Sequence, residues 1–85
     1  MAQKINPGLL SVVVYEERRI LFEGEAISLT SKNQKGVFDV LPEHGNLIAA
    51  VNDYLLIRQT QDTQKRLPIA KGILQVEGNR VVIFV

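Results

Sequence analysis

The sequence predicts an all-β protein, a small β-sandwich or flattened barrel. Short runs rich in β-branched residues recur along the chain, and polar or glycine-containing turns separate them about every ten residues. The last of these turns is Gly78-Asn79, which joins residues 73–77 to residues 80–85 as a two-residue hairpin. The 85 residues, 46% of them hydrophobic, predict a single domain over residues 1–85.

The expected strands follow one another in short steps. The first covers residues 9–15, and the second covers residues 19–23 until Gly24 breaks it. The third covers residues 26–31, and residues 31–36 form a polar loop. The fourth ends before Pro42, since proline cannot donate to a ladder. Further strands are expected at residues 54–58 and, beyond a polar tract, around Leu67 and Ile69.

The middle of the chain leaves two alternatives open. Four apolar residues fall at helical spacing behind Asn46, a suitable N-cap: Leu47, Ile48, Val51 and Leu55. Asn52-Asp53, inside the same segment, favours a turn between two strands. Periodicity alone does not separate a helix from a strand–turn–strand here.

The composition argues against several classes of protein. The formal net charge is only +1, so a dedicated nucleic-acid binder is not expected. The chain has no cysteine, which excludes disulfides and a cysteine-based metal site. No apolar run approaches the roughly 20 residues of a transmembrane helix, and residues 1–8 lack the apolar stretch of a signal peptide. A cytosolic protein, attached to something larger or free, is expected.

Residues that could carry chemistry are few and isolated. His44 is the single histidine, and no nucleophile or further ligand set accompanies it, which favours a structural or interface role. The serines lack a hydrolase elbow, and the glycines match no phosphate-binding loop. We therefore expect no catalytic residue, no metal and no cofactor. The lysines and arginines in or near the loops are expected to be ordinary solubilising charge rather than a site for an anion.

Two segments are apolar on both faces of the expected strands, residues 9–15 and residues 81–85. One interpretation is that these strands lie centrally and other elements of the domain cover them. The alternative is that one face of the sandwich awaits a partner, because monomers rarely leave large apolar patches uncovered.

Three stretches, in order, resemble the N-terminal β-domain of the ε subunit of rotary ATP synthases. LSVVVYEERRILFEGEA (residues 10–26) is similar to the opening of the family, and GVFDVLPEHGNLIAA (residues 36–50) is similar to its more specific G-E-F-G-I-L-P-x-H-x-P-L-I-A motif. KGILQV (residues 71–76), followed by Asn79, Arg80 and Val81, resembles the G-G-x-L-E-V…N-x-V ending. Together they span nearly the whole chain.

The resemblance implies a β-sandwich of about ten short, mostly antiparallel strands, with strand–turn–strand at residues 46–58. It implies a non-catalytic central-stalk subunit that couples the γ subunit to the c-ring of a proton- or sodium-translocating ATP synthase. The location would be cytoplasmic, with membrane contact only through the complex. By position, the ring-facing loop would comprise Lys32, Asn33, Gln34, Lys35, Gly36 and Val37, and the stretch against γ would include Leu41, Pro42, His44 and Ala49.

The chain also departs from the family pattern. Val37 stands where a glutamate is common, Gly45-Asn46 replaces an Ala-Pro-like pair, and Asn52-Asp53-Tyr54 lacks the usual Pro-Gly turn. The C-terminal helical hairpin, which carries inhibition and in some members an ATP site, is absent, and the apolar end at Val85 favours a truncated chain. The alternative function is a stand-alone β-sandwich that binds another protein or a polyanion; an enzyme is third.

Overall fold

A computed structural model describes residues 8–85. Residues 1–7 lie outside the described residues, and so does the prediction made for them that they contain no signal peptide. Every regular element in residues 8–85 is a strand, which confirms the all-β prediction. The strands are β1 (Leu10–Glu16), β2 (Arg19–Ala26), β3 (Ser28–Asn33), β4 (Gly36–Val40), β5 (Leu47–Arg58), β6 (Gln64–Glu77) and β7 (Arg80–Phe84). The described part of the chain therefore has seven strands rather than about ten.

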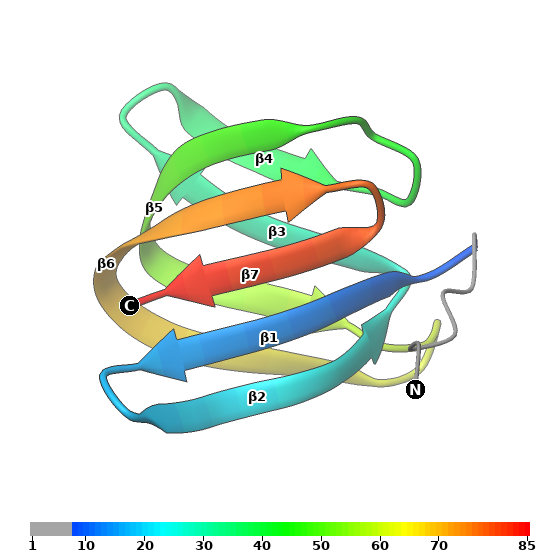
Figure 1. Ribbon diagram of the computed structural model, residues 1–85, viewed down its shortest axis with the longest axis horizontal. Coiled ribbons are helices and arrows are strands. Elements are labelled where there is room, and N and C mark those ends of the chain that lie inside the picture. Colours follow the sequence, from blue (N-terminus) through cyan, green and yellow to red (C-terminus); the bar gives the residue numbers. More distant parts are fainter. Residues whose placement is uncertain (1–7) are drawn as a thin grey trace.

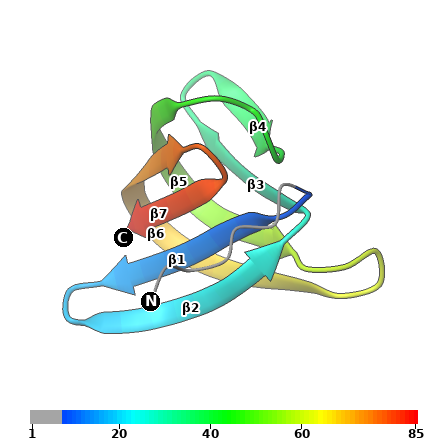
Figure 2. The same ribbon diagram turned by 45° about the vertical axis from the view of Figure 1, so that its right-hand side comes forward.

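The seven strands form one hydrogen-bonded sheet that folds over into two layers (Figures 1 and 2). Its order is β2-β1-β7-β6-β5-β3-β4; all neighbours are antiparallel except β1 and β7, which are parallel. The two longest strands, β5 and β6, take part in both layers. The first half of β5, residues 47–51, and the second half of β6, residues 72–77, continue the layer of β2, β1 and β7. The remaining halves of both strands join β3 and β4. No helix long and apolar enough to cross a membrane occurs in residues 8–85.

The lower strand count has a local cause, which lies in how the chain bends. Residues 47–58 form neither a helix nor strand–turn–strand but one strand with a bulge between Asn52 and Asp53. Asp53 adopts a left-handed backbone conformation with φ of 76°, and a bulge of this kind bends a strand without ending its pairing. Similarly, β2 continues through Gly24, where a break was expected, and residues 64–77 form one strand instead of two.

Two sequence predictions about strand ends are confirmed. β4 ends at Val40, two residues before Pro42. Gly78 and Asn79 form the turn between β6 and β7, and Gly78 has the positive φ of 62° that such a turn requires. The polar loop between β3 and β4 is tighter than expected, because pairing extends to Asn33 opposite Gly36 and leaves only two residues at its tip.

The core lies between the two layers and is built by alternation. Along β1 and β7 every second side chain points inward and is buried. Within residues 8–85, the 14 buried apolar residues form one cluster: Leu10, Val12, Val14, Phe22, Ala26, Leu29, Val40, Val51, Leu55, Ile57, Leu74, Val76, Val81 and Ile83. One polar residue is buried with them, Ser31, whose hydroxyl donates to the carbonyl oxygen of Tyr54 at 2.7 Å. The domain thus has a complete core of its own.

Candidate protein-binding site

A groove of about 860 Å³ lies where the folded sheet does not close upon itself. β4 pairs only with β3, and the first half of β5 pairs only with β6, so these two segments face each other as open edges. The groove runs from the tip of the β3–β4 hairpin along these edges and includes Lys71 and Gly72 of β6. Open edges with apolar side chains beside them are surfaces that a partner can cover.

The groove brings together seven of the ten residues predicted to bind partners. They come from the hairpin, the following loop and β5: Asn33, Gln34, Lys35, Gly36, Val37, His44 and Ala49. Leu41 and Pro42 do not line the groove. Leu41 is nevertheless 52% exposed. The predicted ring-facing loop and part of the predicted γ-facing stretch therefore share one surface, which spacing in the sequence could not show.

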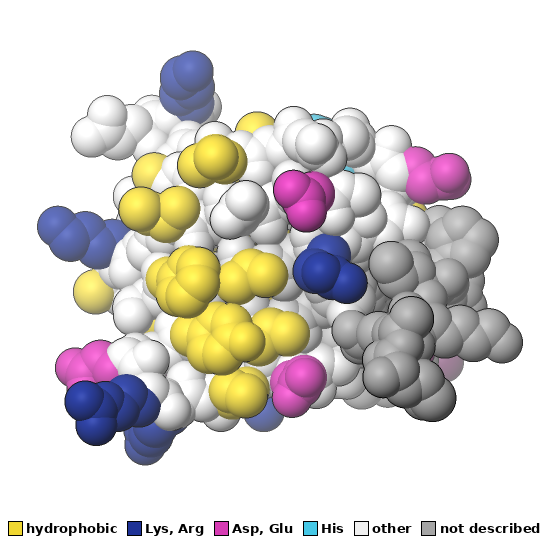
Figure 3. Space-filling model, viewed as in Figure 1, with side chains coloured by type: hydrophobic (Ala, Val, Ile, Leu, Met, Phe, Trp, Pro, Cys, Tyr) yellow, Lys and Arg dark blue, Asp and Glu magenta, His cyan; other side chains and the backbone are white. Residues whose placement is uncertain are grey.

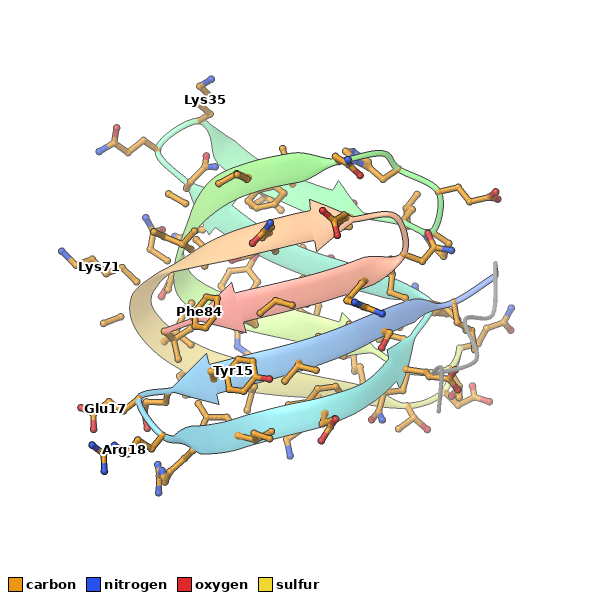
Figure 4. The ribbon with its side chains drawn as sticks, in the orientation of Figure 1. Tyr15, Glu17, Arg18, Lys35, Lys71 and Phe84 are labelled. Atoms are coloured by element: carbon orange, nitrogen blue, oxygen red, sulfur yellow. The ribbon has the colours of Figure 1, made fainter. Side chains whose placement is uncertain are left out.

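Lys32, the remaining predicted residue, is engaged elsewhere. Its Nζ lies 2.8 Å from Oδ2 of Asp53, at the bulge of β5. The hydrogen bond and the charge of each partner raise the pKa of the Lys32 ammonium and lower the pKa of the Asp53 carboxyl. Both side chains are largely open to solvent, so the pair orders the end of β3 more than it stabilises the fold. Lys35, at the tip of the hairpin, instead points away from the body of the protein (Figure 4).

A second apolar surface covers the outer face of the β1–β7–β6 layer. Cross-strand pairing aligns one row of side chains over five strands, and we call it the outer row: Ala50, Ile73, Phe84, Tyr15 and Ile20. Ile73 and Phe84 are 57% and 55% exposed. In the next row Val82 and Val13 are half-buried apolar neighbours, beyond which Arg80 and Glu77 introduce charge. The outer face is apolar at one end of the layer and charged at the other.

The centre of the outer row is an ordered aromatic pair. The rings of Tyr15 and Phe84 stack with centroids 5.4 Å apart and planes 16° from parallel. Figure 3 shows hydrophobic side chains gathered over β1, β7 and β6, with charged side chains around them. Figure 4 places Tyr15 and Phe84 side by side on this face, with Lys71 on one side and Arg18 on the other. Stacking fixes both rings, so a partner loses little entropy in meeting them.

Sequence reasoning identified part of this second surface. Residues 9–15 and 81–85 were recognised as apolar on both faces, and the structure shows that their outward side chains are only partly covered within the described residues. Ile48, which is 74% exposed, and Ile73 were missed. Ile48 lies on β5 and lines the groove, and Ile73 lies on β6 in the outer row. Only the register of these long strands brings the two residues to neighbouring positions of the sheet.

The groove and the exposed apolar side chains are the features of residues 8–85 that a partner could use. Across residues 8–85, no group of three or more histidine, cysteine, aspartate or glutamate side chains is placed to hold a metal ion. His44 is exposed in the β4–β5 loop, and its backbone amide closes a turn to the Leu41 carbonyl at 3.1 Å. A complete core with a groove and an apolar outer face defines a β-sandwich domain whose exposed surfaces are suited to protein contacts.

Comparison with known proteins then identifies the family. Residues 9–85 match the ATP synthase, Delta/Epsilon chain, beta-sandwich domain, and the chain belongs to this family. It is 31% identical over 75 residues to the ATP synthase epsilon chain of Leptospira borgpetersenii, and 26% identical over 77 residues to that of Sulfurimonas denitrificans. These alignments cover 88% and 89% of the chain but 59% of either relative, so the chain spans about three fifths of their length.

Solved structures share the fold at much lower identity. A chain in the Euglena gracilis mitochondrial ATP synthase structure, OSCP/F1/c-ring, superposes with a TM-score of 0.85 at 14% identity and covers 99% of this chain and 54% of that one. A chain of the Tetrahymena thermophila mitochondrial ATP synthase central stalk/c-ring gives 0.72 at 12%, with 89% and 62% covered. The two-layered sheet is therefore shared well beyond detectable sequence similarity.

Proposed function

We propose that the chain is a non-catalytic rotor subunit of a proton- or sodium-translocating ATP synthase, where it binds the γ subunit and the c-ring. Family membership supports the assignment to an ATP synthase. The observation that carries the binding role is that six large hydrophobic side chains are more than half exposed although the core is complete: Ile20, Val37, Leu41, Ile48, Ile73 and Phe84. Such exposure in a small domain indicates surfaces that a partner covers.

The surfaces suggest a division of roles. Residues 32–37, at the tip of the β3–β4 hairpin, are proposed to face the loops of the c-ring. Leu41, Pro42, His44 and Ala49 are proposed to lie against γ, and His44 and Ala49 share the groove with the hairpin. Val37, 65% exposed, would give the ring contact an apolar character. The domain would then act by affinity alone, linking ion-driven rotation of the ring to γ.

Reconstitution tests this function. The chain and the γ subunit from the same source are added to a synthase stripped of its ε subunit, and ion-driven ATP synthesis is measured beside ATP hydrolysis. Restored coupling without inhibition of hydrolysis is expected, because the domain is proposed to act by affinity alone. Failure to bind γ would favour the stand-alone binding module instead, and strong inhibition of hydrolysis would contradict a passive coupling role.

A charge at the proposed contact should weaken it. Leu41→Asp places a carboxylate where a dry contact with γ is proposed, and desolvating an unpaired charge is costly. We expect γ to bind at least about thirtyfold more weakly, the effect of losing a residue worth about 2 kcal/mol. Gln61→Asp is the matched control, since Gln61 is exposed in the β5–β6 loop, away from the groove and the outer row. Unchanged affinity in a folded Leu41→Asp chain would show that γ binds another face.

A further inference from the structure

The loop between β4 and β5, residues 41–46, is attached to the turn between β6 and β7 by a pair of crossed hydrogen bonds. Oδ1 of Asn79, in the turn, accepts the backbone N–H of Glu43 at 2.6 Å. Oδ1 of Asn46, in the loop, accepts the backbone N–H of Gly78 at 3.0 Å. Each segment therefore supplies one side-chain acceptor and one backbone donor to the other.

Both donors belong to residues in a left-handed backbone conformation. Glu43 has φ of 62° and Gly78 has φ of 62°, and Gly45 between the two loop partners has φ of 100°. Non-glycine residues hold such a conformation only when the surroundings fix it. The loop's own backbone contributes one turn bond, from the His44 amide to the Leu41 carbonyl. In residues 41–46, Glu43 is the non-glycine residue with this conformation, and the bond to Asn79 holds its backbone there.

The turn between β6 and β7 is also bonded to β1, in the layer of β2, β1 and β7. The backbone carbonyl of Asn79 accepts the N–H of Ser11 at 2.8 Å, so the turn is fixed to the beginning of β1 as well. In Figure 1 the β4–β5 loop and the β6–β7 turn lie at the same end of the molecule. The loop is thereby tied to the most buried strands of the domain, although its own side chains are mostly exposed.

We propose that Asn46 and Asn79 are positioning residues that hold the partner-binding loop, with Leu41, Pro42 and His44, in one conformation before γ arrives. The effect on γ binding rests on the proposed function, whereas the ordering of the loop by the two asparagines does not. A pre-ordered loop binds faster and more tightly, because no ordering cost is added at the moment of contact.

Two measurements on the full 85-residue chain test the inference. The first is amide hydrogen exchange by NMR at Glu43 and Gly78, which needs no partner. Both amides should be protected in the unmodified chain, and Asn46→Ala should remove protection at Gly78 and reduce it at Glu43. Asn46→Asp keeps an oxygen acceptor and should restore protection. Equal exchange in the unmodified and Asn46→Ala chains would overturn the positioning role whether or not γ binds.

The second measurement is the rate of binding to γ. Asn46→Ala should lower the association rate about three- to tenfold, as expected when the competent loop conformation becomes a minor one, and leave dissociation within about twofold. Asn46→Asp should restore the rate. Thr60→Ala is the control, because it removes a comparable side-chain-to-backbone bond, from the Asp62 amide, in the distant β5–β6 loop. An effect confined to dissociation would show that Asn46 contacts γ directly and would overturn the inference. Absent binding by the unmodified chain would refute the proposed function and leave the exchange experiment to decide the positioning role.

Discussion

The two faces of the layer formed by β1, β7 and the second half of β6 are made of similar residues but have different environments. On the inner face, Val12, Leu74 and Ile83 are fully buried between the layers. On the outer face, Ile73 and Phe84 alternate with them along the same strands and are more than half exposed. The difference shows that an apolar strand side chain can serve the fold or a partner, and that only the covering layer decides which.

The largest contrast is expected between two adjacent residues of β7. Ile83→Ala should lower the free energy of unfolding by about 2–5 kcal/mol, because it leaves a cavity among buried side chains. Phe84→Ala removes more atoms but should cost about 1 kcal/mol or less, since the ring is half exposed and loses mainly its stacking on Tyr15. Urea unfolding of the two variants measures both values. A comparable loss for Phe84→Ala would mean that the outer face supports the fold and would break the comparison.

An intermediate effect is expected at Gly72 of β6, which lies against the end of β7. A Cβ at Gly72 would overlap the backbone carbonyl oxygen of Phe84 and lie 3.1 Å from Cα of Val85. Gly72→Ala should therefore destabilise the domain by about 1–3 kcal/mol through strain in the backbone of β7. Thermal unfolding measures the loss. Gly24→Ala serves as the control, because its Cβ would meet only the end of the Phe22 ring, at 3.2 Å. Equal losses for both would argue against a backbone clash.

The smallest effect should come from the solvent-exposed ion pair between Lys32 and Asp53. The hydrogen bond from Lys32 and its charge lower the pKa of the Asp53 carboxyl. The pair therefore adds its full contribution to the stability of the fold at pH values above 3.8, the ordinary pKa of the carboxyl, and this contribution is lost as pH falls through the lowered pKa. On the basic side the raised pKa of Lys32 keeps the contribution up to and beyond pH 10.5. Asp53→Asn should slightly reduce the drop in melting temperature between pH 7 and strong acid, and 1 M salt should remove the difference. A large, salt-independent difference would show that the pair is shielded from solvent.

Sequence patterns predicted most strands but not their lengths, and they left residues 47–58 open between a helix and strand–turn–strand. The hairpin at Gly78-Asn79 and the strand end before Pro42 depend on local turn chemistry, and both were predictable. The continuity of β5 was not, because Asn52-Asp53 reads as a turn and only pairing with β3 and β6 keeps the strand intact through a bulge. Local composition cannot show where a partner strand will maintain a ladder.

The candidate site shows the same limit. The β3–β4 hairpin residues are adjacent in sequence, so their common location was expected. That they share a groove with His44 and Ala49 depends on the seam between β4 and β5, which is a property of the folded sheet. The anchoring of residues 41–46 likewise joins Asn46 to Gly78, 32 positions apart, and no periodicity signals such a bond.

The parallel pairing of β1 with β7 has a consequence for how the chain reaches this structure. Among the strands of residues 8–85, β1 is synthesised first and β7 last, yet they are immediate neighbours in the sheet. Until β7 is available, β1 can pair only with β2, and the inner face that contains Val12 and Val14 remains open. Long-range pairing of this kind slows folding, typically to milliseconds or longer, and leaves apolar strands exposed to aggregation. Protection of the nascent chain by a chaperone would therefore matter most just before β7 is synthesised.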